Sequence, residues 1–527
     1  MLMQNKLKEI KYKYMNFLEG ITPREYQQKI FSTCKDKNCL VILPTGTGKT
    51  LIALMLAIER MNLFPREKVV FLAPTRPLAE QHLSYFKKHL PELFGEMILF
   101  TGKVSPEKRK KEWETADIIF STPQCVANDL KNKLYTLEDV SLLIEDEAHR
   151  CIKNYDYNYV AQTYKEQASH QRILGLTASP GSEREKIKQI CKNLSVEALE
   201  IRTRDSPDVK EYLQDLKMNL VKIEFPEKFE EIRQPLKKLF NDYVDELKSR
   251  HLLFEMPSKT NLIKLQKKFG MSLSKGSPNF NVLRGMAVCA NAIKLQHSLE
   301  LLETQTLQGF YDYLKELFKQ ASAKKSKGVQ QLVKKPEFNY AYIKTTELIA
   351  GKTEHPKISA LNQLLKETYS KNPDAKCIVF TQYRATASLL CEKLNENLKI
   401  NSRVFIGQAK KNGYGMSQKE QQQMIKDFSY GNVNVLCATS ILEEGLDIPE
   451  VNKVIFYEPV PSEIRKIQRT GRTARLFPGE LIILMTKNTR DEAFHWASFS
   501  REKKMHKTID SMREEMLDKP EKQEKLE

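Results

Sequence analysis

Two stretches of this sequence combine residue types that bind phosphate and a metal ion. The first is "LPTGTGKT", residues 43 to 50, which follows an apolar run and precedes the helical pattern "LIALMLAIER". Its glycines let backbone amides close round phosphates, the Lys49 ammonium can reach the β and γ phosphates, and the Thr50 hydroxyl can bind magnesium. The alternative is an ordinary glycine-rich turn, since Leu43 stands where the strict pattern has glycine. We expect ATP to be held by Thr45, Gly46, Thr47, Gly48, Lys49 and Thr50.

The second stretch places an acid pair at the end of an apolar run that should be a buried strand. In "LLIEDEAHR", residues 142 to 150, Asp146 can hold magnesium through water. Glu147 can orient and deprotonate the water that attacks a γ phosphate. An acidic cap on a solvated helix would explain an isolated D-E-x-H pattern. With a phosphate loop upstream, the sequence favours a nucleotide-hydrolysis site instead.

A third stretch, "QRTGRTAR" at residues 468 to 475, is rich in arginine. Arg472 and Arg475 lie three apart and share a face if the segment is helical, whereas Arg469 lies off that face. Planar guanidinium groups suit the charge on a γ phosphate in the transition state, so both arginines are candidate catalytic groups. A solvated basic helix is the alternative.

These residues need a scaffold that brings strand ends together. Apolar runs alternate with amphipathic sequence over the first 200 residues and again after residue 375, which is typical of parallel sheets covered by helices. Between about 205 and 350 the strand signal disappears and long helical patterns take over. From about 502 the chain becomes almost wholly charged, which predicts a frayed helix and tail.

Composition narrows the classes of protein. At 527 residues the chain should form two or three domains. Its formal charge of +18 favours a polyanion partner. The alternative is a lysine-rich surface that serves solubility alone. No apolar run approaches the roughly 20 residues that span a bilayer, so we expect no membrane partner and a cytoplasmic, nucleoid-associated protein. The nine cysteines are scattered, which favours structural thiols over a zinc site.

The order of further motifs resembles that of the superfamily 2 helicases. "PREYQQ" (23 to 28) looks like their adenine-reading element and "LTASPG" (176 to 181) like their coupling motif, while "VFTQYR" (379 to 384) and "ATSILEEGLDIPEV" (438 to 451) occupy the corresponding places further on. The resemblance implies ATP and Mg²⁺ as cofactors. It also implies roles for these residues: Arg24, Tyr26, Gln27, Gly445 and Asp447 in nucleotide binding, Gln468 in catalysis, and His149, Thr177 and Ser179 in coupling.

Three further stretches carry a closer resemblance than these shared motifs: "SPDVK" (206 to 210), "FYEPVPSEIRKIQRTGRT" (456 to 473) and "TRDEAFHW" (489 to 496). They resemble the archaeal Hef helicase and the Fanconi-anaemia M-type translocases. No E-R-K-x-x-x-D nuclease signature is present, so any nuclease would be a separate partner or lie beyond this sequence. Ala474 stands where the family usually has glycine, which changes the local backbone freedom.

The resemblance predicts an α/β fold with two RecA-like parallel-sheet domains and a helical insert. We expect the first RecA-like domain over 1–203, the insert over 204–350, the second RecA-like domain over 351–502, and a charged tail over 503–527. A motor that moves along any sequence must grip phosphates rather than bases. In the family's strand-tracking segments, the candidate contacts are Arg76, Gln81, Gly102, Thr122, Gln124, Arg384 and Thr439.

The insert has one unusual stretch, residues 256 to 299, which lacks Asp and Glu. Its basic residues are interleaved with Phe269 and Phe280, which suits a surface facing phosphates, although a solvated basic face remains an alternative. The candidate contacts here are Lys264, Lys267 and Lys268.

We therefore predict an ATP-dependent DNA helicase or translocase that remodels forked or branched DNA in repair. A double-stranded RNA translocase of the Dicer type is one alternative, because it shares the insert between RecA-like domains. A nucleotide-gated DNA-binding scaffold is another alternative. Such a scaffold needs a degraded hydrolytic site, whereas Lys49 and Glu147 are both present.

Overall fold

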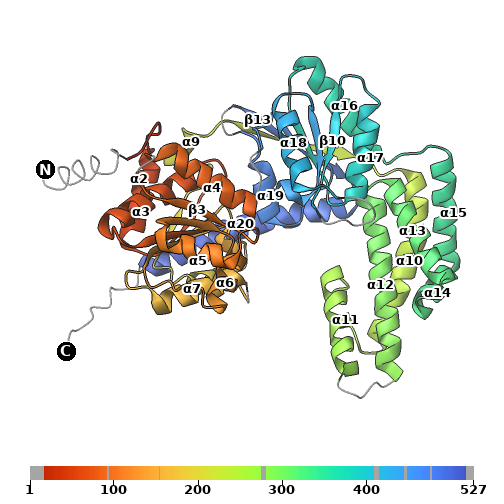
Figure 1. Ribbon diagram of the computed structural model, residues 1–527. Coiled ribbons are helices and arrows are strands. Elements are labelled where there is room, and N and C mark those ends of the chain that lie inside the picture. Colours follow the sequence, from red (N-terminus) through yellow and green to blue (C-terminus); the bar gives the residue numbers. More distant parts are fainter. Residues whose placement is uncertain are drawn as a thin grey trace.

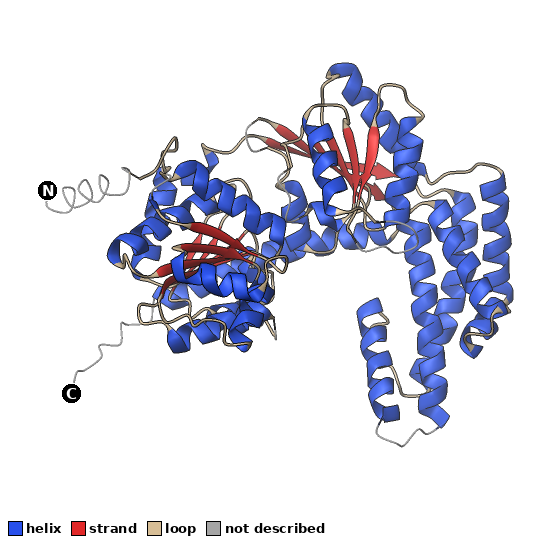
Figure 2. Cartoon of the chain, viewed as in Figure 1, coloured by secondary structure: helices blue, strands red, loops and turns tan. Residues whose placement is uncertain are grey.

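The computed structural model describes residues 17 to 517 apart from 92–93, 154, 275–279, 409–414, 444–447 and 475–476. Figure 1 shows two α/β domains, called domain 1 and domain 2, with a helical bundle attached to the side of domain 2 that faces away from domain 1. Figure 2 shows that each α/β domain encloses one sheet between layers of helices. The expected fold class is confirmed.

Domain 1 is built on a parallel sheet of seven strands in the order β3-β4-β2-β5-β6-β1-β7. Its central strands are buried along their whole length, which is why they read as continuous apolar runs. The strands are β1 (Cys39–Ile42), β2 (Lys68–Leu72), β3 (Met97–Phe100), β4 (Ile118–Ser121), β5 (Val140–Asp146), β6 (Ile173–Thr177) and β7 (Ala198–Ile201).

The helices of domain 1 cover both faces of this sheet, and each face has its own apolar core. One face is covered by α2 (Glu25–Asp36), α3 (Lys49–Leu63), α4 (Arg76–His89) and the short α9 (Pro207–Lys210). The other face is covered by α5 (Pro106–Thr115), α6 (Pro123–Lys131), α7 (Asp156–Gln167) and α8 (Arg184–Asn193), while η2 (Ala148–Arg150) follows β5.

Domain 2 has a parallel sheet of six strands in the order β10-β11-β9-β12-β13-β8. The strands are β8 (Leu216–Ile223), β9 (Cys377–Phe380), β10 (Ser402–Phe405), β11 (Val435–Ala438), β12 (Lys453–Phe456) and β13 (Gly479–Thr486). The helices are α16 (Pro356–Lys371), α17 (Arg384–Asn395), α18 (Gln418–Ser429), η3 (Ser440–Leu442) and α19 (Glu463–Thr470).

Strand β8 differs from the sequence-based expectation. The region from 205 was expected to lack strands, yet residues 216–223 pair with β13 along their full length and belong to domain 2. The strand lies at the sheet edge and most of its side chains are exposed or half-buried, so it has no continuous apolar run to reveal it.

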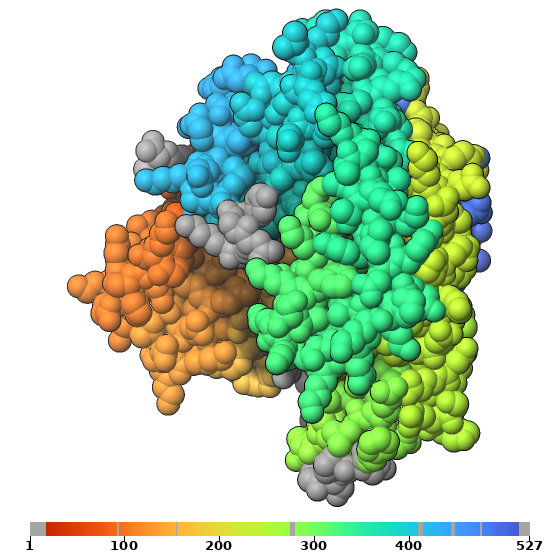
Figure 3. Space-filling view, turned by 90° about the vertical axis from the view of Figure 1, so that its right-hand side faces the viewer, coloured from red at the N-terminus to blue at the C-terminus, as the bar shows by residue number. Residues whose placement is uncertain are grey.

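The helical bundle begins after β8 and has its own apolar core. Its helices are α10 (Glu227–Ser249), α11 (Lys259–Ser274), α12 (Phe280–Thr304), α13 (Leu307–Ser322), α14 (Lys327–Val333) and α15 (Pro336–Ala350). Figure 1 shows α11 beside the lower half of α12, on the side of the bundle nearer to domain 1. The surface is hollowed between this bundle and domain 1 in Figure 3.

The last described helix, α20 (Arg490–Leu517), corrects the expectation of a charged tail from residue 503. It continues past that point and buries Met505, Ile509 and Met512 in a core of domain 1. These three side chains recur at helical spacing within a charged sequence, which is enough to form one narrow apolar stripe. The helix therefore starts on domain 2 and ends on domain 1.

Three further findings concern the described residues only. Among them, no helix is both long enough and apolar enough to cross a membrane. No group of three or more His, Cys, Asp or Glu side chains in the same ranges is placed to hold a metal ion. All nine cysteines are buried free thiols, as expected for structural residues.

Candidate nucleotide and nucleic-acid sites

The phosphate loop lies between β1 and α3. Gly46 and Gly48 both adopt positive φ, at 85° and 81°, a conformation that favours glycine. A side chain at Gly48 would also lie 2.3 Å from Nε2 of Gln27. Lys49 Nζ donates to the carbonyl oxygens of Leu43, at 3.0 Å, and Pro44, at 3.3 Å. The loop thus curls round the ammonium group that was predicted to meet phosphate.

The predicted adenine-reading residues support this loop from α2. Gln27 Nε2 donates to the Thr47 carbonyl at 3.0 Å, and the Tyr26 hydroxyl donates to the same oxygen. Gln27 Oε1 also accepts from the Arg24 amide at 2.8 Å. Tyr26 is fully buried, which raises the pKa of its hydroxyl, and its hydrogen bond to the loop backbone is itself buried.

The acid pair stands at the carboxyl end of β5. Asp146 ends the strand, and Glu147 adopts a left-handed conformation at φ 52°, which turns the chain into η2. Asp146 Oδ2 lies 2.9 Å from Nε2 of His82, a contact that the sequence did not predict. Burial alone would raise the pKa of Asp146, but the His82 hydrogen bond and the nearby Lys49 charge outweigh burial and lower it.

A further acid, Glu145, precedes this pair and was not singled out from the sequence. It is completely buried, and burial raises its pKa to about 8. Its neighbours Cys151 and Lys165 lower that pKa by smaller amounts. The signal available in the sequence was an acidic residue inside an apolar run.

The predicted coupling residues form a connected group. His149 Nδ1 lies 3.2 Å from a Glu147 carboxylate oxygen and 3.2 Å from the Thr177 hydroxyl. Thr177 donates to the carbonyl of Ser179 at 3.0 Å and accepts from its amide at 3.1 Å. Ser179 Oγ then donates to the sulfur of Met505 on α20 at 3.0 Å. A continuous path therefore runs from the acid pair to the last helix.

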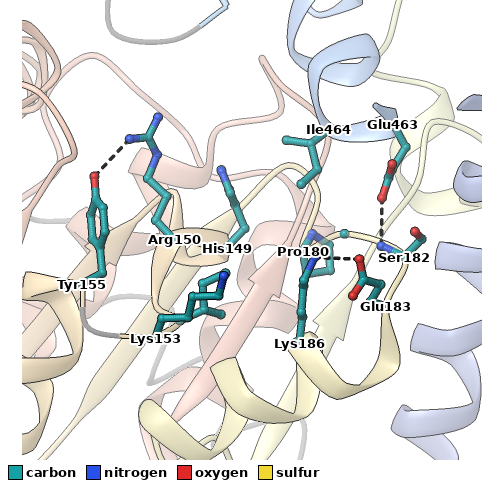
Figure 4. Close-up of a pocket in the computed structure, with 12 residues that line it drawn as sticks. His149, Arg150, Lys153, Tyr155, Pro180, Ser182, Glu183, Lys186, Glu463 and Ile464 are labelled. Atoms are coloured by element: carbon teal, nitrogen blue, oxygen red, sulfur yellow. Dashed lines mark hydrogen bonds and ion pairs between the residues drawn. The ribbon is translucent and has the colours of Figure 1, made fainter. Parts of the chain in front are cut away.

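The same loop touches domain 2 directly. The Ser182 amide donates to Glu463 Oε1 at 2.9 Å, and Figure 4 shows this contact at the edge of a cavity of about 540 Å³. The cavity is lined from domain 1 by His149, Arg150 and Lys186 and from α19 by Glu463 and Ile464. It is thus an opening between the two α/β domains, next to the coupling residues.

Helix α19 extends into the third stretch only as far as Thr470. Arg472 therefore lies beyond it, and its guanidinium donates to the carbonyl of Glu443 at 2.8 Å. Arg469 is almost fully buried, pairs with Glu443 at 2.8 Å and lies over the Phe380 ring, which makes it structural. Gln468 is buried on α19, and Arg475, Gly445 and Asp447 lie outside the described residues.

Motif residues of the two domains nevertheless meet. A side chain at Gly471 would lie 2.6 Å from Cβ of Thr45 in the phosphate loop, so backbone from domain 2 packs directly on that loop. Ala474, where the family usually has glycine, adopts a positive φ of 57°. That conformation costs roughly 1–2 kcal/mol for a residue other than glycine.

The candidate nucleic-acid contacts of domain 1 follow β2, β3 and β4, which are neighbours at one end of the sheet. Arg76 begins α4, Gly102 follows β3, and Thr122 precedes α6, which carries Gln124. Gln81 is half-buried on α4. Because parallel strands end at the same edge, these residues share an edge with the phosphate loop and the acid pair, but lie over different strands.

In domain 2, Arg384 begins α17 after β9, and Thr439 follows β11, the strand next to β9. In the bundle, Lys264, Lys267 and Lys268 are exposed on α11, opposite its buried face. Two other basic residues of the acid-free stretch have partners outside it: Lys259 pairs with Glu300 at 2.6 Å and Arg284 with Glu246 at 2.8 Å. Phe269 is core, whereas Phe280 is 79% exposed.

Three protein families match consecutive parts of the chain. The DEAD/DEAH box helicase family matches residues 24–187, a helical bundle of ATP-dependent RNA helicases matches 228–351, and the helicase conserved C-terminal domain matches 356–477. Among solved structures, the Hef helicase domain of Pyrococcus furiosus is 40% identical, with a TM-score of 0.69 over 90% of this chain and 98% of that one.

Curated relatives match about nine tenths of this chain. A Methanocaldococcus jannaschii protein named as an ATP-dependent RNA helicase is 37% identical over 93% of this chain and 61% of its own length. The DEAD-box ATP-dependent DNA helicase Fancm of Drosophila melanogaster is 31% identical over 89% of this chain and 33% of its own length. The chain thus spans less than two thirds of these relatives.

Proposed function

This chain belongs to the superfamily 2 helicases that include the Hef helicase domain, and from that premise we propose that it is an ATP-dependent DNA helicase or translocase acting on forked or branched DNA. The proposal rests on one observation above all: the phosphate loop, the acid pair and the candidate strand contacts lie along a single edge of the domain 1 sheet. That edge can hold a nucleotide and a nucleic acid at once.

The chemistry proposed for ATP hydrolysis divides among a few side chains. Lys49 binds the β and γ phosphates, Glu147 activates the attacking water, and Arg472 together with Arg475 neutralises charge on the γ phosphate. Gln468 completes the set from domain 2. Arg24 and Gln27 recognise the base, while Gly445 and Asp447 contact the nucleotide from domain 2.

A magnesium ion fits the donors that this site offers. Thr50 supplies a hydroxyl and Asp146 a carboxylate, and hard oxygen donors of this kind suit Mg²⁺, which completes its shell with water and substrate phosphates. Bound with ATP, magnesium would supply neutralisation of phosphate charge during transfer.

The candidate grip on the DNA comes from both α/β domains. Arg76, Gln81, Gly102, Thr122 and Gln124 would follow one strand on domain 1, and Arg384 with Thr439 would follow it on domain 2. His149, Thr177 and Ser179 would couple this grip to hydrolysis, because His149 lies 3.2 Å from a Glu147 carboxylate oxygen and hydrogen bonds lead from its Nδ1 atom through Thr177 and Ser179 to α20.

A double-stranded RNA translocase is the second candidate. The observation that favours it is the match of residues 228–351 to a bundle found in RNA helicases, together with the RNA helicase name of the Methanocaldococcus relative. The DNA helicase name of Fancm favours the first candidate.

The discriminating experiment measures ATPase stimulation by forked DNA, single-stranded DNA, duplex DNA and duplex RNA side by side. We expect the forked DNA to stimulate most, and stimulation by duplex RNA alone would favour the second candidate. Glu147→Gln should bind ATP but lose at least about 100-fold in turnover, since general-base groups contribute roughly 10²–10⁴-fold. Parental turnover by this variant at saturating DNA would make the catalytic assignment wrong.

Preference for branched DNA is assigned to the bundle. Domains 1 and 2 can grip one strand, and exposed Lys264, Lys267 and Lys268 on α11 offer charge to a second set of phosphates. Neutralising all three should weaken fork binding and lower the slope of log affinity against log salt by about 3, roughly one for each phosphate contact. Binding of single strands should persist.

The matched control neutralises three exposed lysines of the same bundle: Lys319 in the last turn of α13, and Lys324 and Lys325 just after that helix. Equal losses from the two triple variants would identify a general electrostatic surface.

We propose, finally, that cleavage of such DNA is the task of a separate nuclease partner, so purified protein should unwind a fork without cutting it.

A further inference from the structure

His82 connects two parts of domain 1 that the motifs treat as separate. It lies on α4, the helix that follows β2 and begins at the candidate strand contact Arg76. Its Nε2 atom lies 2.9 Å from Oδ2 of Asp146, which ends the neighbouring strand β5. The contact therefore crosses from the strands that carry candidate nucleic-acid residues to the strands that carry the nucleotide residues.

Both members of this contact are held in place. The side chains of His82 and Asp146 are only 9% and 10% exposed. The His82 ring packs on the Phe71 ring of β2, with centroids 4.3 Å apart, which restricts its rotation. The main-chain oxygen of Asp146 accepts from the Tyr157 hydroxyl at 2.8 Å, so the backbone below the carboxylate is fixed as well.

We propose that His82 is a positioning residue that orients the Asp146 carboxylate for the magnesium-bound nucleotide and ties it to α4. This inference rests on the proposed function, because it needs Asp146 to act beside magnesium. A hydrogen bond to Oδ2 selects one orientation of the carboxylate. Partners of this kind typically change metal affinity or activity by about 10–100-fold when they are removed.

The position of His82 on α4 gives the contact a second consequence. Arg76 and Gln81 lie on the same helix, Gln81 being adjacent in sequence to His82. A displacement of α4 by a bound strand reaches Asp146 through one hydrogen bond, so occupancy by nucleic acid and by magnesium nucleotide become linked. Linkage is reciprocal, and each ligand raises the affinity for the other by the same factor.

Helix α4 also supplies a matched control. His89 is as buried as His82, since 8% of the whole His89 residue is exposed against 7% for His82. Its Nδ1 atom lies 2.8 Å from the carbonyl oxygen of Glu19. It lies at the other end of the helix from Arg76, where its ring packs against Tyr85 with centroids 4.6 Å apart. A general effect of removing a buried histidine from α4 would appear equally at both positions.

The test measures equilibrium binding of a fluorescent ATP analogue, with Mg²⁺ or with EDTA, in the presence and absence of single-stranded DNA. His82→Phe keeps a ring against Phe71 but removes the donor, and His82→Gln keeps an amide donor. We expect His82→Phe to match the parent in EDTA, to lose about 10–100-fold of the magnesium-dependent gain in affinity, and to lose the gain caused by DNA. His82→Gln should be intermediate, and His89→Phe should match the parent.

The inference is overturned if His82→Phe retains both gains, or if it weakens binding equally with Mg²⁺ and EDTA, which would indicate a purely structural histidine. Thermal melting of each variant identifies loss of folding. If His82→Phe does not fold, the magnesium-dependent and DNA-dependent gains in affinity are measured in His82→Gln instead, and they decide the question. Failure of the proposed function is separate: the parent protein itself would show no DNA-stimulated ATPase, while the magnesium arm without DNA still tests the role of His82.

Discussion

Domain 2 is joined to the helical bundle and to domain 1 in contrasting ways. Toward the bundle, Lys357 of α16 donates to the Thr304 carbonyl at 3.1 Å, and within domain 2 the same lysine pairs with Asp491 of α20, with both side chains fully buried. Arg490 pairs with Glu303 at 2.8 Å on the same junction. Buried charges of this kind tolerate little separation, because each would be left unpaired away from water.

Toward domain 1, the contacts are of another kind, and the ion pair there, between Arg184 and Glu515 of α20, is exposed. One amide of domain 1, from Ser182, meets Glu463, and the backbone at Gly471 packs on Thr45. Helix α20 adds an apolar stripe that includes Met505. Apolar stripes and single hydrogen bonds can slide or re-form, so we infer that domain 2 and the bundle move as one body relative to domain 1.

The largest expected effect tests whether that movement completes the catalytic site. The Arg472 guanidinium donates to the Glu443 carbonyl of domain 2, and we expect it to approach the γ phosphate when the domains close. Arg472→Ala should lower ATPase turnover by about 10³-fold or more while nucleotide affinity stays within several-fold. Steady-state kinetics and nucleotide titration give the two values.

Arg465→Ala is the control and should change turnover little, because this half-exposed arginine near the start of α19 lies beside the same Glu443, at 3.6 Å. A large loss of nucleotide affinity without loss of turnover in Arg472→Ala would instead indicate a structural arginine. The two junctions of domain 2 would then be more alike than proposed.

The next effect concerns the junction with the bundle. Lys357→Met leaves Asp491 buried without its partner, which should cost about 3–5 kcal/mol in the free energy of unfolding. Chemical denaturation, followed by far-ultraviolet circular dichroism, measures the loss. The double variant Lys357→Met with Asp491→Leu should recover most of it, since neither charge is then left unpaired. If Lys357→Met alone costs less than about 1 kcal/mol, the junction is not the rigid one.

A smaller effect concerns α20. Met505 is 2% exposed in the core of domain 1, so Met505→Ala should weaken the docking of α20 by about 2 kcal/mol, at the low end for such truncations. Hydrogen exchange should then rise in the second half of α20 and stay unchanged in its first half on domain 2. Met505→Leu conserves volume and should leave exchange nearly unaltered. Uniform exchange changes along α20 would show that the helix docks as a single unit.

The smallest effect is a methyl group at the interface of the two α/β domains. Gly471→Ala places a carbon 2.6 Å from Cβ of Thr45, and overpacking of this kind costs about 1–3 kcal/mol. We expect a loss of roughly 10-fold in turnover, equivalent to about 1.4 kcal/mol, with DNA binding retained. Gly270→Ala, which meets nothing within 4 Å on α11, should leave turnover unchanged. Equal turnover in both variants would mean that this contact opens without cost.

Much of this molecule follows from its sequence, because the informative patterns are local. The phosphate loop needs its glycines and Lys49 within one turn of chain, and the acid pair needs only an apolar run before it. Alternating apolar runs and helical patterns gave the two α/β domains for the same reason. Strand β8 escaped this reasoning, because an edge strand with an exposed face has no continuous apolar run.

Tertiary structure alone decided which distant residues meet. Nothing local distinguishes His82 from His89, yet the order of β2 beside β5 brings only His82 to Asp146. The charged sequence after 503 hides a stripe that becomes visible only against the core of domain 1. The sequence separated Arg469 from Arg472 only by helical phase, whereas burial against Phe380 is what makes Arg469 structural. Such contacts depend on sheet order and on the packing of whole elements, which no short window of sequence contains.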